Sequence, residues 1–180
     1  MTENGIRGHH LGYLLQVDRA HMQYDAAGYP PYEAKSRAAS DVREWMQGIV
    51  WDMQTGFTRD PVNEEYYRDV IGDERSNVYP VARNFATALL GLYQLTDEEI
   101  TVHSEKDGIC RACVIGAHCE EETYEYDMPY MRDLKRIADR LEIPYVFTDG
   151  VFTINAADLK QVLREMNTEE IAFANDTGRF

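Results

Sequence analysis

The three cysteines of this chain lie close together in one short stretch. They are Cys110, Cys113 and Cys119 in a sequence of 180 residues. Two thiols separated by two residues, with a third six positions further on, can turn their sulfur atoms toward one point, and that point is most simply a metal. Small residues such as Gly108 and Gly116 allow the backbone to bend around such a ligand. The pattern predicts a metal-binding loop over about residues 103–120.

The spacing leaves the kind of metal open. A Cys-x2-Cys pair is common to zinc sites and to iron–sulfur sites. A cluster held by three cysteines would leave one iron for a histidine, water or substrate, whereas a closed zinc site would need a fourth ligand to give Cys3His. The alternative to a metal is a set of free buried thiols or a redox pair, but a redox pair usually opens a helix after a strand and would leave Cys119 unexplained.

Histidines are the candidates for a fourth ligand. His118 is adjacent to Cys119, and neighbouring side chains rarely reach one metal. His103 precedes the loop, while His9 and His10 could reach the loop from the beginning of the chain. If these two open a helix, they point about 100° apart, so at most one of them easily faces a given site.

Two segments of the chain resemble a known family. Ile6 to Leu11 reads Ile-Arg-Gly-His-His-Leu, and Asp107 to Cys119 carries the cysteines. Together they resemble a small prokaryotic family of unknown function whose members are thought to bind iron–sulfur clusters. The resemblance implies a metal centre in which the histidine pair and the cysteine loop lie together. Tyr13 stands where that family has a cysteine, and the middle of this chain, about residues 63–95, looks expanded.

Composition limits the possible partners. Lys and Arg total 18 against 32 for Asp and Glu, which gives a formal charge of −14. Such a surface repels nucleic-acid phosphates and anionic lipid, and no basic patch is visible in the sequence. No apolar run approaches the roughly 20 residues that span a bilayer, and the start of the chain is not typical of a secretion signal. We therefore expect a cytoplasmic protein whose partner is a protein or small molecule, not nucleic acid or membrane.

The first half of the chain shows helical periodicity. Leu11, Leu14 and Leu15 predict a helix with His9 and His10 in its first turn, and Pro30-Pro31 interrupts the pattern. A long helix is predicted over about 32–54, with Trp45 among its core-facing residues. Further helices are predicted over about 62–71 and 79–95.

The second half mixes strands and helices. A short strand over 100–103 leads into the cysteine loop, and a helix is predicted over about 129–141. Two β-rich runs around Asp149-Gly150 predict a hairpin, after which Asn155 should cap a helix. We thus expect one compact domain over 1–180, of mainly helical α+β class, with a helix-hairpin-helix over about 128–167 and a loosely held tail over 168–180.

Three functions are consistent with these residues. The first is an iron–sulfur protein with Cys110, Cys113 and Cys119 as ligands. The second is a zinc-stabilised protein-interaction module without catalysis. The third is an enzyme that uses an open iron of a three-cysteine cluster. The sequence contains no phosphate-binding loop or nucleophile elbow that would name a reaction.

Overall fold

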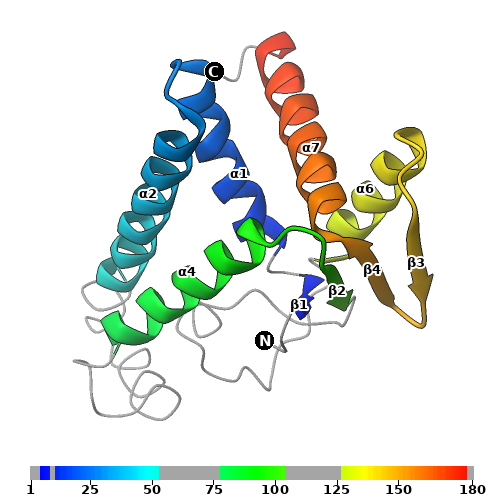
Figure 1. Cartoon of the computed structure of the whole chain (residues 1–180), viewed down its shortest axis with the longest axis horizontal. Helices are drawn as coiled ribbons and strands as arrows, with labels where there is room; N and C mark the ends of the chain where they lie inside the picture. The colour runs from blue at the N-terminus through cyan, green and yellow to red at the C-terminus, as the bar shows by residue number, and fades with distance from the viewer. Residues whose placement is uncertain (1–4, 9–10, 53–77, 104–126, 178–180) are drawn as a thin grey trace.

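The protein is a mainly helical α+β structure built on a small sheet (Figure 1). The computed structural model describes residues 5–8, 11–52, 78–103 and 127–177. The elements are β1 (Gly5–Arg7), α1 (Leu11–Ala26), α2 (Pro31–Asp52), α4 (Val78–Gln94), β2 (Glu99–His103), α6 (Asp127–Arg140), β3 (Tyr145–Thr148), β4 (Val151–Asn155) and α7 (Ala156–Asp176). The fold class expected from the sequence is confirmed at this level. The predicted helix over 62–71 lies outside the described residues.

The sheet is mixed and has the strand order β1-β2-β4-β3. β1 is parallel to β2, and the other neighbouring strands are antiparallel. Because side chains alternate across a strand, one face collects the buried residues Ile6, Val102 and Phe152, which are partners across three strands. The ring of Tyr145 stacks on Phe152 with centroids 4.7 Å apart. This face of the sheet forms part of the hydrophobic core.

Helix α1 lies at the centre of the helical layer. Leu11, Leu14 and Val17 are almost completely buried along it, and it contacts α2, α4, α6 and α7. Figure 1 shows α2 and α7 on either side of α1, with α4 running from near the lower end of α2 to the lower end of α1, just before β2. Burying each leucine side chain stabilises the fold by roughly 1.5–3 kcal/mol relative to leaving it exposed. The buried face of α1 thereby holds α4, α6 and α7, which are distant in sequence, around one helix.

Local sequence signals explain several element boundaries. Pro31 is the first residue of α2, where the missing N–H of proline has no cost. Asn155 caps α7 as expected, since its side-chain oxygen accepts a hydrogen bond from the N–H of Ala157 at 2.9 Å. Between β3 and β4, Asp149 and Gly150 both have positive φ angles, 52° and 77°. Such a pair matches the twist of the two strands that it joins.

The beginning and end of the chain differ from the sequence expectation. Ile6 lies in strand β1, which the periodicity did not indicate. Helix α1 is described from Leu11, and His9 and His10, predicted in its first turn, lie outside the described residues. At the other end α7 continues to Asp176, past the point where a loose tail was expected. The reason is tertiary: Asn167 is fully buried, and Glu170 pairs with Arg19 on α1 at 2.5 Å. Residues 178–180 lie outside the described residues.

Trp45 is also placed differently from the prediction. It was expected to fill the core, but 38% of its surface is exposed. Its ring rests against Tyr13 of α1, with centroids 5.5 Å apart. Periodicity identified the correct face of α2 at Ala39 and Val42, which are buried, but at Trp45 this face is only partly covered. Within the described ranges, none of the helices combines the length and the apolar character that crossing a bilayer requires.

Candidate functional site

The predicted metal-binding residues fall almost entirely outside the described part of the chain. This applies to Cys110, Cys113 and Cys119 and to both His9 and His10. Over residues 5–8, 11–52, 78–103 and 127–177, no three His, Cys, Asp or Glu side chains are grouped so that they could hold a metal ion. Of the predicted ligands, the structure describes only His103.

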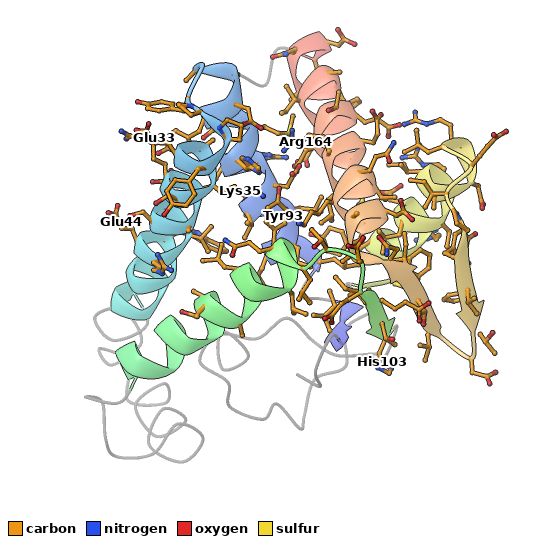
Figure 2. All side chains as sticks on the ribbon, in the orientation of Figure 1. Glu33, Lys35, Glu44, Tyr93, His103 and Arg164 are labelled. Atoms are coloured by element: carbon orange, nitrogen blue, oxygen red, sulfur yellow. The ribbon has the colours of Figure 1, made fainter. Side chains whose placement is uncertain are left out.

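His103 is the last residue of β2 and is half-buried. It follows Val102, which is fully buried in the core, so strand alternation directs the histidine to the opposite face of the sheet. Figure 2 shows the labelled side chain at the end of β2, away from the helices. The imidazole is therefore held next to the beginning of the segment that contains the cysteines.

The pairing of β1 with β2 relates the two predicted motifs. The register is parallel, with Gly5 opposite Thr101, Ile6 opposite Val102 and Arg7 opposite His103. In a parallel pair both strands end at the same edge of the sheet. The chain therefore leaves β1 toward His9 and leaves β2 toward the cysteines from neighbouring positions.

A second group of polar residues lies in the helical layer and centres on Asp18, which is only 1% exposed. The carboxylate accepts a hydrogen bond from the hydroxyl of Tyr93 at 2.7 Å and from the amide of Asn167 at 3.1 Å. It also accepts from Nε and Nη2 of Arg164 at 3.0–3.1 Å. A buried carboxylate is tolerated only when it is paired and hydrogen-bonded. We call Asp18, His21, Tyr93, Arg164 and Asn167 the Asp18 network.

His21 forms the other end of this network. Its Nδ1 lies 3.0 Å from Oη of Tyr93, and because the Tyr93 hydroxyl hydrogen points to Asp18, we assign Nδ1 as the donor. Its Nε2 lies 3.5 Å from Oδ1 of Asp25. Burial lowers the pKa of His21, and the opposing effect of the Asp25 carboxylate does not reverse this shift. The neutral imidazole is thus favoured.

The same surroundings keep Tyr93 protonated. Burial raises the pKa of Tyr93, and the nearby Asp18 carboxylate raises it further. Figure 2 shows Tyr93 and Arg164 extending toward one another from α4 and α7. The hydroxyl acts as a fixed donor to Asp18 and as an acceptor from His21. The network therefore joins α1, α4 and α7 through satisfied hydrogen bonds.

The sequence analysis missed the Asp18 network, although one signal for it was present. Asp18 follows Leu11, Leu14 and Leu15 at steps of seven, four and three residues, and these leucines form the apolar stripe of α1. A carboxylate on such a stripe must have a buried partner. Its partners lie 75 and more residues away in the sequence, so periodicity could not identify them.

The surface between α1 and α2 contains a small hollow. Its volume is about 180 Å³, and Arg19, Asp41 and Trp45 are among the residues that line it. This is below the roughly 300 Å³ at which small-molecule pockets usually begin. It shares no residue with the Asp18 network, so we do not assign it a ligand.

Comparison of the chain with protein-family models, curated proteins and solved structures finds no match.

Proposed function

We propose that this chain is a metal-binding protein with an iron–sulfur cluster held by Cys110, Cys113 and Cys119. A histidine, His9 or His10 first and His103 second, would complete or cover the site. The observation that supports the proposal is the parallel pairing of β1 with β2. A histidine motif and a cysteine motif about a hundred residues apart in the sequence are joined to neighbouring strand ends.

Chain connectivity limits how far the histidines can lie from that edge. His9 follows Arg7 by two residues, so their Cα atoms are at most about 8 Å apart. Cys110 follows His103 by seven residues, which allows a separation of at most about 25 Å. An antiparallel pair would instead send the two segments to opposite ends of the sheet. The observed register is thus compatible with one shared centre.

The donor set fits an iron–sulfur cluster. Thiolates are the usual ligands of such clusters, and three of them leave one iron free to bind a different group. When bound, a cluster of this kind supplies either electron transfer or a Lewis-acid site. The chain would contribute the thiolates and the neighbouring imidazole, whose hydrogen bonding and charge tune such a centre.

The test is the metal and sulfide content of protein produced and purified without oxygen. We expect iron and acid-labile sulfide in the natural chain, together with the visible absorption of a cluster. C110S, C113S and C119S should each reduce both contents. His21→Gln is the matched control, because His21 belongs to the Asp18 network and not to the sheet edge. Protein that contains no iron after anaerobic reconstitution would overturn the proposal.

Elemental analysis also separates the zinc alternative. One zinc per chain without sulfide, and loss of folded structure on chelation, would replace the cluster by a Cys3His zinc site. Alanine variants of His9, His10 and His103, measured in parallel, would identify which histidine affects the bound metal. An unchanged metal content in all three would remove the histidines from the proposed site.

A further inference from the structure

A groove with apolar lining opens between helices α1, α6 and α7. Its volume is about 300 Å³, which is the size at which small-molecule pockets usually begin. Leu15 of α1 and Met166 of α7 line it, and both belong to the hydrophobic core. Phe173 lines it as well, although 58% of this residue is exposed. A groove that reaches the core in this way can remove much of a compact apolar molecule from water.

One wall of the groove is set by close helix packing. Tyr130 of α6 lines the groove and packs against the core. A Cβ atom on residue Gly12 of α1 would lie 3.2 Å from the hydroxyl oxygen of Tyr130, closer than most such contacts. The missing side chain of the glycine therefore lets Tyr130 lie against α1. The shape of the groove thus depends on the packing of helices.

The charged residues that line the groove are mostly acidic. Asp133, Glu169 and Glu170 supply carboxylates, and Arg136 supplies a guanidinium. Arg136 already donates hydrogen bonds to Glu169 at 2.6 Å and to Asp133 at 3.3 Å. An anion would have to displace one of these carboxylates and would be repelled by the others. The lining therefore disfavours an anionic ligand.

Glu170 is placed to bind a cation beside the apolar lining. Its Oε2 accepts a hydrogen bond from Arg19 at 2.5 Å. A carboxylate can accept about four hydrogen bonds, so this contact uses only part of its capacity. Glu170 and Phe173 are three residues apart on α7, and such residues are neighbours on a helix surface. The formal charge of −14 over the whole chain also attracts cations.

We propose that this groove binds a small amine, a molecule with a compact apolar body and one ammonium group. The body would lie against Leu15, Met166 and Phe173, and the ammonium group would donate to Glu170 through a short, charge-assisted hydrogen bond. Apolar contact supplies most of the affinity, because water screens an exposed ion pair. The groove shares no residue with the proposed metal centre, so either proposal can fail without the other.

The test compares three probes that share one apolar body. They are 1-naphthylmethylammonium, 1-naphthalenemethanol and 1-naphthoate, which are positive, neutral and negative at pH 7. In isothermal titration at low, constant ionic strength, we expect saturable binding of the ammonium probe to one site, weaker binding of the alcohol and the weakest binding of the carboxylate. Added salt should reduce the difference between the ammonium probe and the alcohol.

Two substitutions at exposed positions test the two parts of the groove. Phe173→Ala should weaken the binding of the ammonium probe and of the alcohol by about fivefold each. Glu170→Gln should weaken only the ammonium probe, by about two- to fivefold, as is usual for an exposed ion pair.

Phe147→Ala and Glu165→Gln are the matched controls. Phe147 is also an exposed aromatic residue, and Glu165 is also a carboxylate of α7 that pairs with an arginine, Arg140, at 2.9 Å. Neither is among the described residues that line the groove. Both controls should bind the probes as the natural chain does, and all four variants should keep its helical circular dichroism.

The proposal is overturned if the ammonium probe does not bind saturably or if the carboxylate probe binds as tightly. It is also overturned if Glu165→Gln and Glu170→Gln have the same effect, because the ammonium probe would then respond only to the overall negative charge. A second copy of the chain is the alternative occupant. A dimer in sedimentation equilibrium that Phe173→Ala dissociates would assign the groove to self-association and overturn the proposal.

Discussion

Helix α7 is joined to its neighbours by arginine–carboxylate pairs in two regions that differ in exposure to water. In the Asp18 network, Arg164 contacts a carboxylate that is 1% exposed at 3.0–3.1 Å. On the surface between α6 and α7, Arg136 and Arg140 both contact Glu169 at 2.6 Å, and the side chain of Glu169 is 34% exposed. We call this second group the Glu169 cluster.

The comparison indicates that contact distance alone does not rank these ion pairs by their contribution to folding stability. Water screens the Glu169 cluster, and an exposed ion pair contributes at most about 1 kcal/mol. A buried carboxylate that loses a partner has no water to replace it. We therefore expect the network with longer distances to have the larger effect on stability. The following predictions test that ranking, beginning with the largest expected effect.

Asp18→Ala should destabilise the protein most. It leaves Arg164, Tyr93 and Asn167 without their common acceptor, and removing one partner of a buried ion pair typically costs about 3–5 kcal/mol. Because the Arg164 side chain keeps 36% exposure, we expect the lower end of that range. Urea unfolding followed by circular dichroism measures the change. Asp133→Ala, which removes an exposed partner of Arg136 on α6, is the control; an equal loss in both variants would refute the ranking.

Tyr93→Phe should have the next largest effect. It removes the hydroxyl that donates to Asp18 and accepts from His21, and a hydrogen bond to a charged group contributes about 1.5–3 kcal/mol. Tyr145→Phe is the matched control, since its hydroxyl donates to Asp139 at 2.8 Å on the exposed surface. We expect less than about 0.5 kcal/mol there. Similar losses of unfolding free energy in the two variants would show that burial does not distinguish these hydroxyls.

The pH dependence of folding stability should reveal the lowered pKa of His21. Its folded pKa lies below the ordinary value of 6.5, mainly because it is buried. The unfolded chain therefore binds more protons than the folded chain as the pH falls below 6.5, and folding stability is lost in that direction. Compared with His21→Gln, the natural chain should lose more of its free energy of unfolding between pH 7 and pH 5. Parallel stability curves for the two proteins over this range would contradict the assignment.

Glu169→Gln should have the smallest effect. The Arg136 guanidinium lowers the pKa of Glu169, so its stabilising contribution is present above the ordinary value of 4.5 and is lost as the pH falls through the folded pKa. Solvent screening limits this contribution to less than about 1 kcal/mol. The measured difference should shrink further in high salt. A loss comparable to that of Asp18→Ala would show that the Glu169 cluster is not a screened surface pair.

The sequence predicted those elements whose signals are local. The double proline marked the beginning of α2, and Asn155 was correctly assigned as the cap of α7. Strand β1 was missed because it has only three residues and is stabilised by pairing with β2, about 95 positions away. The extension of α7 to Asp176 was missed for a similar reason, since Arg19 and the partners of Asn167 lie on α1.

The candidate sites divide in the same way. Cys110, Cys113 and Cys119 were proposed from their spacing alone and stay a prediction, since they lie outside the described residues. The Asp18 network was not proposed from the sequence. Its members come from α1, α4 and α7, and nothing in their spacing along the chain indicates that they meet.

By itself, the sequence determined the acidic charge, the mainly helical character and the grouping of the cysteines, because composition and short-range periodicity are properties of neighbouring residues. Only the tertiary structure decided which carboxylate is buried and which arginine neutralises it. It also decided that β1 and β2 run parallel and end at one edge. These features depend on contacts between residues far apart in the chain. At such contacts the cost of desolvation is balanced by pairing, and no local sequence pattern predicts that balance.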